Sequence, residues 1–286
     1  MTATSSHLVN KRLENPITAS PPSLLDPNAV SFIPSSDVNA VKALKDIRIA
    51  NLNNVIIGQL NINSLRNKFS SLIELVHGNI DILILTETKL DHTFPEKQFF
   101  IPGYKKPYRL DRKNNGGGVM IYIREDIPSD ILIKHKLPSN IEAICVEINL
   151  RKNRLLLIGA YHSTNKTYGS SDETFFYNIG LTLDVYSNFD KFLLAGDFNI
   201  EENDDILDEF MEDYLAKNLV KEPTCFKNAE NPSCIDLFIT NSYQSFQKTT
   251  TITTGLSDFH KMTVTIMKTT FPTHCQIQNN ILQNTL

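Results

Sequence analysis

The stretch that decides the fold class is Leu193-Leu-Ala-Gly-Asp-Phe-Asn199. An apolar run, 192–195, ends here in Gly-Asp-x-Asn, which is typical of a buried strand that delivers Asp197 and Asn199 into the following loop. A carboxylate can transfer a proton or bind a metal ion, and a neighbouring amide can orient a phosphate or a water molecule. Asp and Asn are also ordinary turn residues, so the stretch gains weight only from similar polar groups elsewhere.

Apolar, strand-like runs recur along the chain. They cover 55–60, 80–85, 118–123, 144–148, 155–160, 192–195, 235–240 and 262–267. Most are rich in Ile, Leu and Val on both faces, which favours sheets covered on both sides. Helical spacing of apolar residues predicts helices over 67–76, 172–186 and 204–215. Between residues 116 and 160 strands follow one another directly, which favours an α/β layered sandwich with antiparallel or mixed sheets over a doubly wound parallel fold.

Composition divides the chain into three parts. Residues 1–50 are rich in Ser, Thr, Pro and Asn, so we predict a largely disordered leader, within which 37–47 could form a short helix. Residues 51–268 are predicted to form the packed domain, and residues 269–286 a polar tail.

The whole-chain composition excludes several classes of protein. With 286 residues, 41% hydrophobic, the chain has ample length for a core. No apolar run could span a bilayer and the N-terminus lacks the apolar core of a secretory signal, so we expect no membrane partner. The four cysteines show no metal-binding spacing and are predicted to be free thiols. A net charge of −4 argues mildly against nucleic-acid binding, because phosphate neutralisation supplies much of that affinity.

Polar residues stand at or near the ends of the predicted strands in six places. They are Asn61 with Asn63, Glu87, Tyr161, Asp197 with Asn199, Asp236, and Asp258 with His260. Asp236 lies within an apolar strand, where an unpaired carboxylate is costly, so we expect a partner such as a histidine. Six such groups suit one composite site at a common edge of two sheets.

The chemistry that fits this set is metal-assisted hydrolysis of a phosphoester. Glu87 is a plausible ligand for a hard cation, and a His–Asp pair could activate water. No Ser or Cys stands in a nucleophile elbow, which counts against a covalent route. The glycine run 116–118 could cradle a phosphate, but it leads into a strand and lacks a P-loop lysine, so a flexible hairpin turn is the better interpretation.

Six segments, taken in order, carry a family resemblance. They are Asn61-Ile-Asn-Ser-Leu-Arg-Asn-Lys68, Asp81-Ile-Leu-Ile-Leu-Thr-Glu-Thr88, Gly116-Gly-Gly-Val-Met-Ile-Tyr122, Gly196-Asp-Phe-Asn199, Cys234-Ile-Asp-Leu-Phe-Ile-Thr240 and Leu256-Ser-Asp-Phe-His260. With them the chain resembles the endonuclease/exonuclease/phosphatase superfamily over roughly residues 54–268. More narrowly, it is similar to the apurinic-endonuclease-like domain of non-LTR (LINE-type) retrotransposon polyproteins.

The resemblance implies a four-layer α/β sandwich, with two mixed β-sheets packed face to face and helices outside. It implies a Mg²⁺-dependent DNA endonuclease, with Mn²⁺ as a substitute, that acts as a monomer and nicks one strand to leave a 3′-hydroxyl. Such an enzyme would need access to the nucleus to reach chromosomal DNA. Those polyproteins continue into a reverse transcriptase, and on that comparison the chain resembles either a fragment of such a polyprotein or a freed endonuclease domain.

The resemblance also implies a role for each residue at the metal. Glu87 would be the principal Mg²⁺ ligand. Asn61 and Asn63 would lie beside it and touch the metal, its water or the phosphate. Asp258 would add negative charge near the metal.

Five further residues would carry the reaction. Tyr161 would contact the scissile phosphate, Asp197 would handle a proton, and Asn199 would orient the phosphate. Asp236 would fix the ring of His260, which would contact phosphate or act as the base.

Two departures from the family pattern leave alternatives open. The family usually has a carboxylate where Asn63 stands, and Phe259 separates Asp258 from His260. An inserted residue in an extended segment turns the next side chain to the opposite face, so the loop must bulge if His260 is to stay in place. We expect a working site. A weak or inert retrotransposon remnant that only binds, and a small-molecule phosphatase of the same fold, remain the alternatives.

Overall fold

The structure is a computed structural model that describes residues 35–268, apart from 113–115, 134, 151–152, 166, 168 and 202–203. The predicted leader up to residue 34 and the predicted tail from residue 269 lie outside the described residues. In chain order the elements are α1 (Ser35–Ala50), β1 (Val55–Asn61), α2 (Phe69–Val76), β2 (Ile82–Thr86), η1 (Glu96–Phe99), β3 (Tyr108–Leu110), β4 (Val119–Ile123), β5 (Ser129–Ile131), β6 (Glu142–Leu150), β7 (Asn153–Tyr161), α3 (Asp172–Val185), β8 (Lys191–Asp197), α4 (Asp205–Asp213), β9 (Lys217–Asn218), β10 (Asp236–Thr240), η2 (Tyr243–Ser245), β11 (Phe246–Ile252) and β12 (Met262–Met267). None of the helices among these elements is long and apolar enough to cross a membrane.

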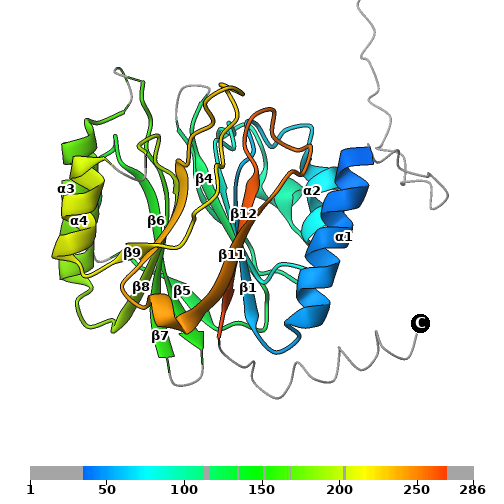
Figure 1. Cartoon of the computed structure of the whole chain (residues 1–286), viewed down its shortest axis with the longest axis horizontal. Coiled ribbons are helices and arrows are strands. Elements are labelled where there is room, and N and C mark those ends of the chain that lie inside the picture. The colour runs from blue at the N-terminus through cyan, green and yellow to red at the C-terminus, as the bar shows by residue number, and fades with distance from the viewer. Residues whose placement is uncertain are drawn as a thin grey trace, which may run out of the picture. The chain divides into compact units, whose positions relative to one another are not determined.

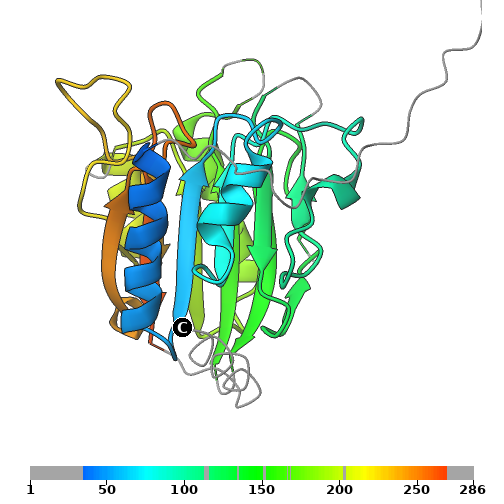
Figure 2. The same cartoon turned by 90° about the vertical axis from the view of Figure 1, so that its right-hand side faces the viewer.

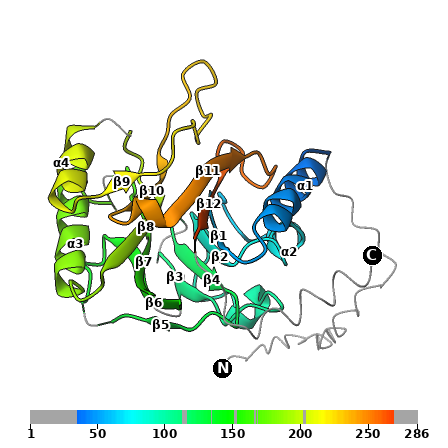
Figure 3. The ribbon, with the colours of Figure 1, turned by 60° about the horizontal axis from the view of Figure 1, so that its bottom comes forward.

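Two mixed sheets of six strands pack face to face. Their strand orders are β11-β12-β1-β2-β4-β3 and β5-β6-β7-β8-β10-β9. The pairs β1–β2 and β7–β8 are parallel, and the other pairs within the sheets are antiparallel. Helices α1 and α2 cover the outer face of the first sheet, and α3 and α4 cover the outer face of the second (Figures 1 and 3). This confirms the predicted four-layer sandwich.

Alternation of side chains along each strand explains why the strands are apolar throughout. In β1, Val55 and Ile57 face the core between the two sheets, whereas Ile56 and Leu60 face the core under the helices. Every residue of β1 is therefore buried. The near-continuous Ile, Leu and Val content follows from burial on both faces.

Helix α1 corrects the predicted boundary of the leader. Residues 35–50 form a packed helix, longer than the 37–47 stretch that the sequence suggested. Ala40 and Leu44, one helical turn apart, are buried in the core shared with α2. Arg48 pairs with the buried Asp81 at 2.5 Å. The Ser- and Asn-rich composition concealed this short apolar stripe, so the packed domain begins earlier than residue 51.

The topology brings the ends of several strands together at one end of the two packed sheets. The parallel pair β1–β2 places Asn61 opposite Thr86, and the parallel pair β7–β8 places Tyr161 opposite Asp197. The antiparallel strand β10 begins with Asp236 opposite Asp197. The loops after β1 and before β12 gather at the upper end of the sheets in Figure 2. Residues from six segments of the chain therefore meet at this end of the two sheets.

Candidate active site

One pocket of about 650 Å³ gathers most of the predicted site residues. Seven of them line it: Asn61, Asn63, Glu87, Tyr161, Asp197, Asn199 and His260. The other two are joined to residues of the wall, since Asp236 hydrogen-bonds His260 and Asp258 hydrogen-bonds Asn63. The structure thus brings together all nine residues proposed from the sequence.

Glu87 follows β2 directly and has a left-handed backbone, with φ of 49°. Its Oε1 accepts hydrogen bonds from the Tyr161 hydroxyl at 2.9 Å and from the Asn61 amide at 3.3 Å. The Lys89 ammonium lies 3.0 Å from its Oε2. Burial alone would raise the pKa of Glu87, but the contacts from Lys89, Tyr161 and Asn61 together hold it below its usual value. Glu87 is therefore an anion with oriented oxygens.

Lys89 is a site residue that the sequence analysis missed. Its ammonium donates a hydrogen bond to Asn63 Oδ1 as well as contacting Glu87, so these two oxygens converge on one cation. Carboxylate and amide oxygens are the donors that Mg²⁺ prefers, and the set therefore fits such an ion. The signal was available in Thr86-Glu-Thr-Lys89, where the lysine stands two residues beyond the carboxylate.

Asn61 and Asp258 take different positions around this cation. The Asn61 side chain donates to both Glu87 and Asp197, at 3.3 and 2.7 Å, and its Oδ1 accepts from the Asn63 backbone N–H at 3.1 Å. Asn61 thereby ties the two carboxylates together. Asp258 is exposed and accepts from the Asn63 amide at 2.8 Å. Asp258 therefore lies beside the cation position, because it is bonded to the amide of Asn63, whose oxygen contacts the cation.

Asp197 is buried at the centre of the site. Its oxygens accept from Asn61 at 2.7 Å and from the backbone N–H of Asn199 at 3.1 Å. Burial, and then the neighbouring Asp236 carboxylate, raise the pKa of Asp197 well above its usual value. Asn199 has φ of 49°, and its side-chain amide donates to the His162 carbonyl at 2.8 Å. This bond fixes the loop after β8.

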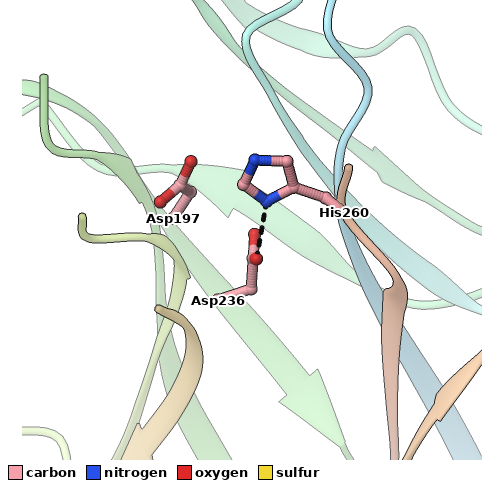
Figure 4. Close-up of side chains that lie close together, drawn as sticks. All are labelled: Asp197, Asp236 and His260. Atoms are coloured by element: carbon pink, nitrogen blue, oxygen red, sulfur yellow. Dashed lines mark hydrogen bonds and ion pairs between the residues drawn. The ribbon is translucent and has the colours of Figure 1, made fainter. Parts of the chain in front are cut away.

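Asp236 and His260 form the pair expected from the sequence. Asp236 accepts from His260 Nδ1 at 2.8 Å and from Gln59 Nε2 at 3.0 Å, so this fully buried carboxylate is satisfied. Ligand atoms of Asp197, Asp236 and His260 all lie within 4.8 Å of one another, and the Asp197 carboxylate faces the imidazole in Figure 4. Burial alone would lower the pKa of His260, but the Asp236 and Cys225 hydrogen bonds and the nearby carboxylates raise it to about 11.

The inserted Phe259 does not displace His260. Phe259 is 46% exposed at the pocket rim, and its carbonyl accepts the Phe226 N–H at 2.8 Å. His260 pairs with Cys225 as an isolated β-bridge, which sets its side chain toward Asp236. The loop therefore absorbs the extra residue. The bridge also places Cys225 Sγ 3.7 Å from His260 Nε2, a neighbour that cysteine spacing could not reveal.

Comparisons with known proteins identify the family and the fold. The sequence pattern of the Endonuclease/Exonuclease/phosphatase family matches residues 58–258. No curated protein matches the chain.

Solved structures share the fold at low sequence identity. The AP endonuclease LMAP from Leishmania major is 15% identical with a TM-score of 0.62, over 84% of this chain and 100% of that one. The endonuclease domain of TRAS1, a telomere-specific non-LTR retrotransposon, is 14% identical with a TM-score of 0.58, over 76% and 99%. The 3′ phosphatase NExo from Neisseria, bound to a product DNA hairpin, is 17% identical with a TM-score of 0.56, over 74% and 99%.

Proposed function

The chain belongs to the endonuclease/exonuclease/phosphatase family, and on that premise we propose that it is a Mg²⁺-dependent DNA endonuclease that nicks one strand and leaves a 3′-hydroxyl. One observation carries the proposal. A cation position between Glu87 and Asn63, the buried Asp197 and the Asp236–His260 pair all border a single open pocket. These are the parts that phosphodiester hydrolysis needs: a metal ligand set, a group that moves a proton and a cation for the phosphate.

The metal would be held by Glu87 and Asn63, with Asp258 adding negative charge beside them. Bound Mg²⁺ supplies charge neutralisation for the phosphate, and Mn²⁺ suits the same oxygen donors. Tyr161 donates its single hydroxyl proton to Glu87 and so orients this principal metal ligand before the substrate phosphate binds. Asn61 keeps Glu87 and Asp197 at a fixed separation.

Asp197 is the group that moves the proton in this proposal. Its raised pKa makes the ionised carboxylate a stronger base than an exposed one. The attacking water bonds to phosphorus and gives a proton to Asp197, the P–O3′ bond breaks, and O3′ takes up a proton from solvent. Asn199, fixed through His162, borders the same pocket and orients the phosphate.

His260 binds the phosphate as a cation. Asp236 holds Nδ1, and Nε2, which lies 3.7 Å from Cys225 Sγ in the pocket wall, is the ring atom that would meet a phosphate oxygen. The raised pKa keeps the imidazole protonated at neutral pH, which suits a hydrogen-bond donor and disfavours a base. A protonated His260 would also stabilise the charge that grows on the phosphate during attack.

DNA is the substrate class that the neighbours and the pocket favour. Two of the three neighbours described above are endonucleases and the third is bound to a DNA hairpin. The exposed Lys227 and the half-buried Lys89 bring positive charge to the pocket despite the acidic net charge. All nine site residues come from one chain, so a monomer suffices.

The test is nicking of supercoiled plasmid, in Mg²⁺ and in EDTA. We expect Mg²⁺-dependent open circles that a DNA polymerase can extend, which reports the 3′-hydroxyl. Glu87→Ala and His260→Ala should abolish nicking. Glu96→Ala is the matched control, because Glu96 forms an exposed ion pair with Lys106 at 2.8 Å and does not line the pocket. Absence of nicking by folded wild-type protein would contradict the proposal.

A weak or inert remnant is the competing proposal, and Lys89 is the observation that favours it. Its ammonium already satisfies Glu87 and Asn63, so a metal ion must displace it. A folded domain whose melting temperature never responds to Mg²⁺ would support the remnant, since binding to the native state must stabilise it. Release of phosphate from a phosphorylated sugar or inositol, without DNA cleavage, would support a small-molecule phosphatase instead.

A further inference from the structure

The glycine run that precedes β4 has a structural partner in Glu142, the first residue of β6. Glu142 Oε2 accepts the Gly118 N–H at 2.5 Å, and its Oε1 accepts Arg112 Nε at 2.7 Å. The Arg112 and Glu142 side chains are only 13% and 8% exposed. This nearly buried ion pair anchors the turn between β3 and β4 against the second sheet.

The same turn holds the loop that carries Glu87. The Gly117 carbonyl accepts the Lys89 N–H at 2.9 Å, and the Gly118 carbonyl accepts the Thr88 N–H at 3.4 Å. Two glycine carbonyls are thus bonded to the segment following Glu87, and the Gly118 N–H, a donor that could have cradled a phosphate, is bonded to Glu142.

Glycine is required at both positions of this turn. Gly117 and Gly118 have φ of 58° and 92°, which favours residues without a Cβ. A Cβ on Gly117 would lie 2.4 Å from Glu142 Oε2, and one on Gly118 would lie 2.4 Å from Thr88 Oγ1. Gly117 and Gly118 are therefore closely packed where the chain enters β4. The predicted hairpin is confirmed by the antiparallel pairing of β3 with β4, and these two glycines are held tightly within it.

Arg112 reaches Glu87 by a second route. Its guanidinium lies 5.5 Å from the centroid of the Tyr161 ring. The hydroxyl of that ring donates to Glu87 Oε1 at 2.9 Å. Arg112 thus contacts the ring that orients Glu87 and, through Glu142, anchors the turn that holds its loop.

We propose that Arg112 is a positioning residue for the divalent metal, acting with Glu142 through Tyr161 and the glycine turn to fix the Glu87 carboxylate. This rests on the proposed function, because it assigns Arg112 to the same metal site. Partners that orient a ligand from behind typically contribute 10–100-fold to metal affinity. Because Arg112 and Glu142 act on the orientation of the Glu87 carboxylate, their replacement should lower the affinity for the metal ion even when no reaction takes place.

The experiment is a Mn²⁺ titration of full-length protein followed by electron paramagnetic resonance, which detects the free ion. We expect Arg112→Gln to raise the dissociation constant for Mn²⁺ about tenfold or more, with partial recovery in Arg112→Lys. Glu142→Gln should weaken binding in the same direction while preserving side-chain shape. If Arg112→Gln does not fold, Glu142→Gln and Arg112→Lys carry the test.

Arg154→Gln is the matched control. Arg154 also pairs with a glutamate, Glu147 at 2.7 Å, and also lies over an aromatic ring, Phe189 at 4.5 Å, but neither partner borders the pocket. It should bind Mn²⁺ like wild type. Equal binding by wild type and by the Arg112 and Glu142 variants would overturn the inference and leave the metal site standing. Absence of Mn²⁺ binding by wild type would overturn both this inference and the proposed function.

Discussion

His260 Nδ1 donates a 2.8 Å hydrogen bond to Asp236 Oδ2, and this bond joins the loop before β12 to the first residue of β10. Gln59 from β1 donates a second hydrogen bond to the Asp236 carboxylate, at 3.0 Å. The pair therefore links both sheets and leaves His260 Nε2 beside Cys225 at the pocket wall. Because the position of His260 depends on the loop around Phe259, changes in that loop should alter the rate of DNA cleavage.

Replacing Glu87 with Gln should abolish Mg²⁺-dependent nicking. The loss in metal affinity should be at least the 10–100-fold that removal of an outer partner costs. Melting temperature measured against Mg²⁺ concentration checks this independently of activity. A variant that keeps the wild-type response to Mg²⁺ would place the metal elsewhere.

Replacing Lys89 with Met should increase the affinity for Mg²⁺. The ammonium contacts Glu87 and Asn63, so its removal frees both oxygens for the ion. The same Mg²⁺ series of melting curves measures the change. Lys106→Met, which removes a surface pair with Glu96, is the control. Unchanged or weaker Mg²⁺ binding in Lys89→Met would show that the lysine supports the metal site and does not compete for it.

The stability of the metal-free protein should depend on pH through His260. Its folded pKa is raised from 6.5 to about 11, so the stabilisation is fully present below the unfolded pKa and is lost as pH rises toward the folded one. Relative to His260→Gln, the free energy of unfolding of wild type should fall between about pH 7 and about pH 10, by at most about 1.4 kcal/mol per pH unit. Urea denaturation at several pH values measures the slope. Parallel curves for the two proteins would exclude the raised pKa.

Alkylation of Cys225 should block nicking. The thiol borders the pocket beside His260, and the hydrogen bond from His260 lowers its pKa despite the opposing effect of burial. Cys225→Ser should keep its activity and resist N-ethylmaleimide, whereas Cys234→Ser should remain sensitive. Mass spectrometry identifies the modified residue. Equal sensitivity of the wild type and Cys225→Ser would assign the effect to another thiol.

Deleting Phe259 should harm the protein more than replacing it with Ala. The deletion restores a Ser-Asp-His spelling, but it shortens the loop that keeps His260 on Asp236 and removes the carbonyl bonded to Phe226. Phe259→Ala keeps the backbone and should retain cleavage. Nicking rates and melting temperatures of the two variants separate these effects. A fully active deletion would show that the extra residue is dispensable.

The sequence predicted the strands with long apolar runs, because burial on both faces leaves a local signal. It missed β11, Phe246–Ile252, whose residues Gln247 to Thr251 are all polar and which pairs at the edge of a sheet. It also missed β9, which has two residues and no period to detect. The sequence suggested helix α1 only as a short helix over 37–47 within a disordered leader, whereas it spans Ser35–Ala50 and buries Ala40 and Leu44 in the core.

The sequence by itself determined which polar residues lie at or near the ends of the strands. That pattern is local, because each polar residue stands beside an apolar run of the chain. Only the tertiary structure decided which of them touch. Three contacts join residues from different strands and loops: Lys89 with Asn63, Cys225 with His260, and the Arg112 guanidinium over the Tyr161 ring. Those distances follow from how two twisted sheets pack and where their loops close. That packing is a property of the whole core, and no short stretch of the chain encodes it.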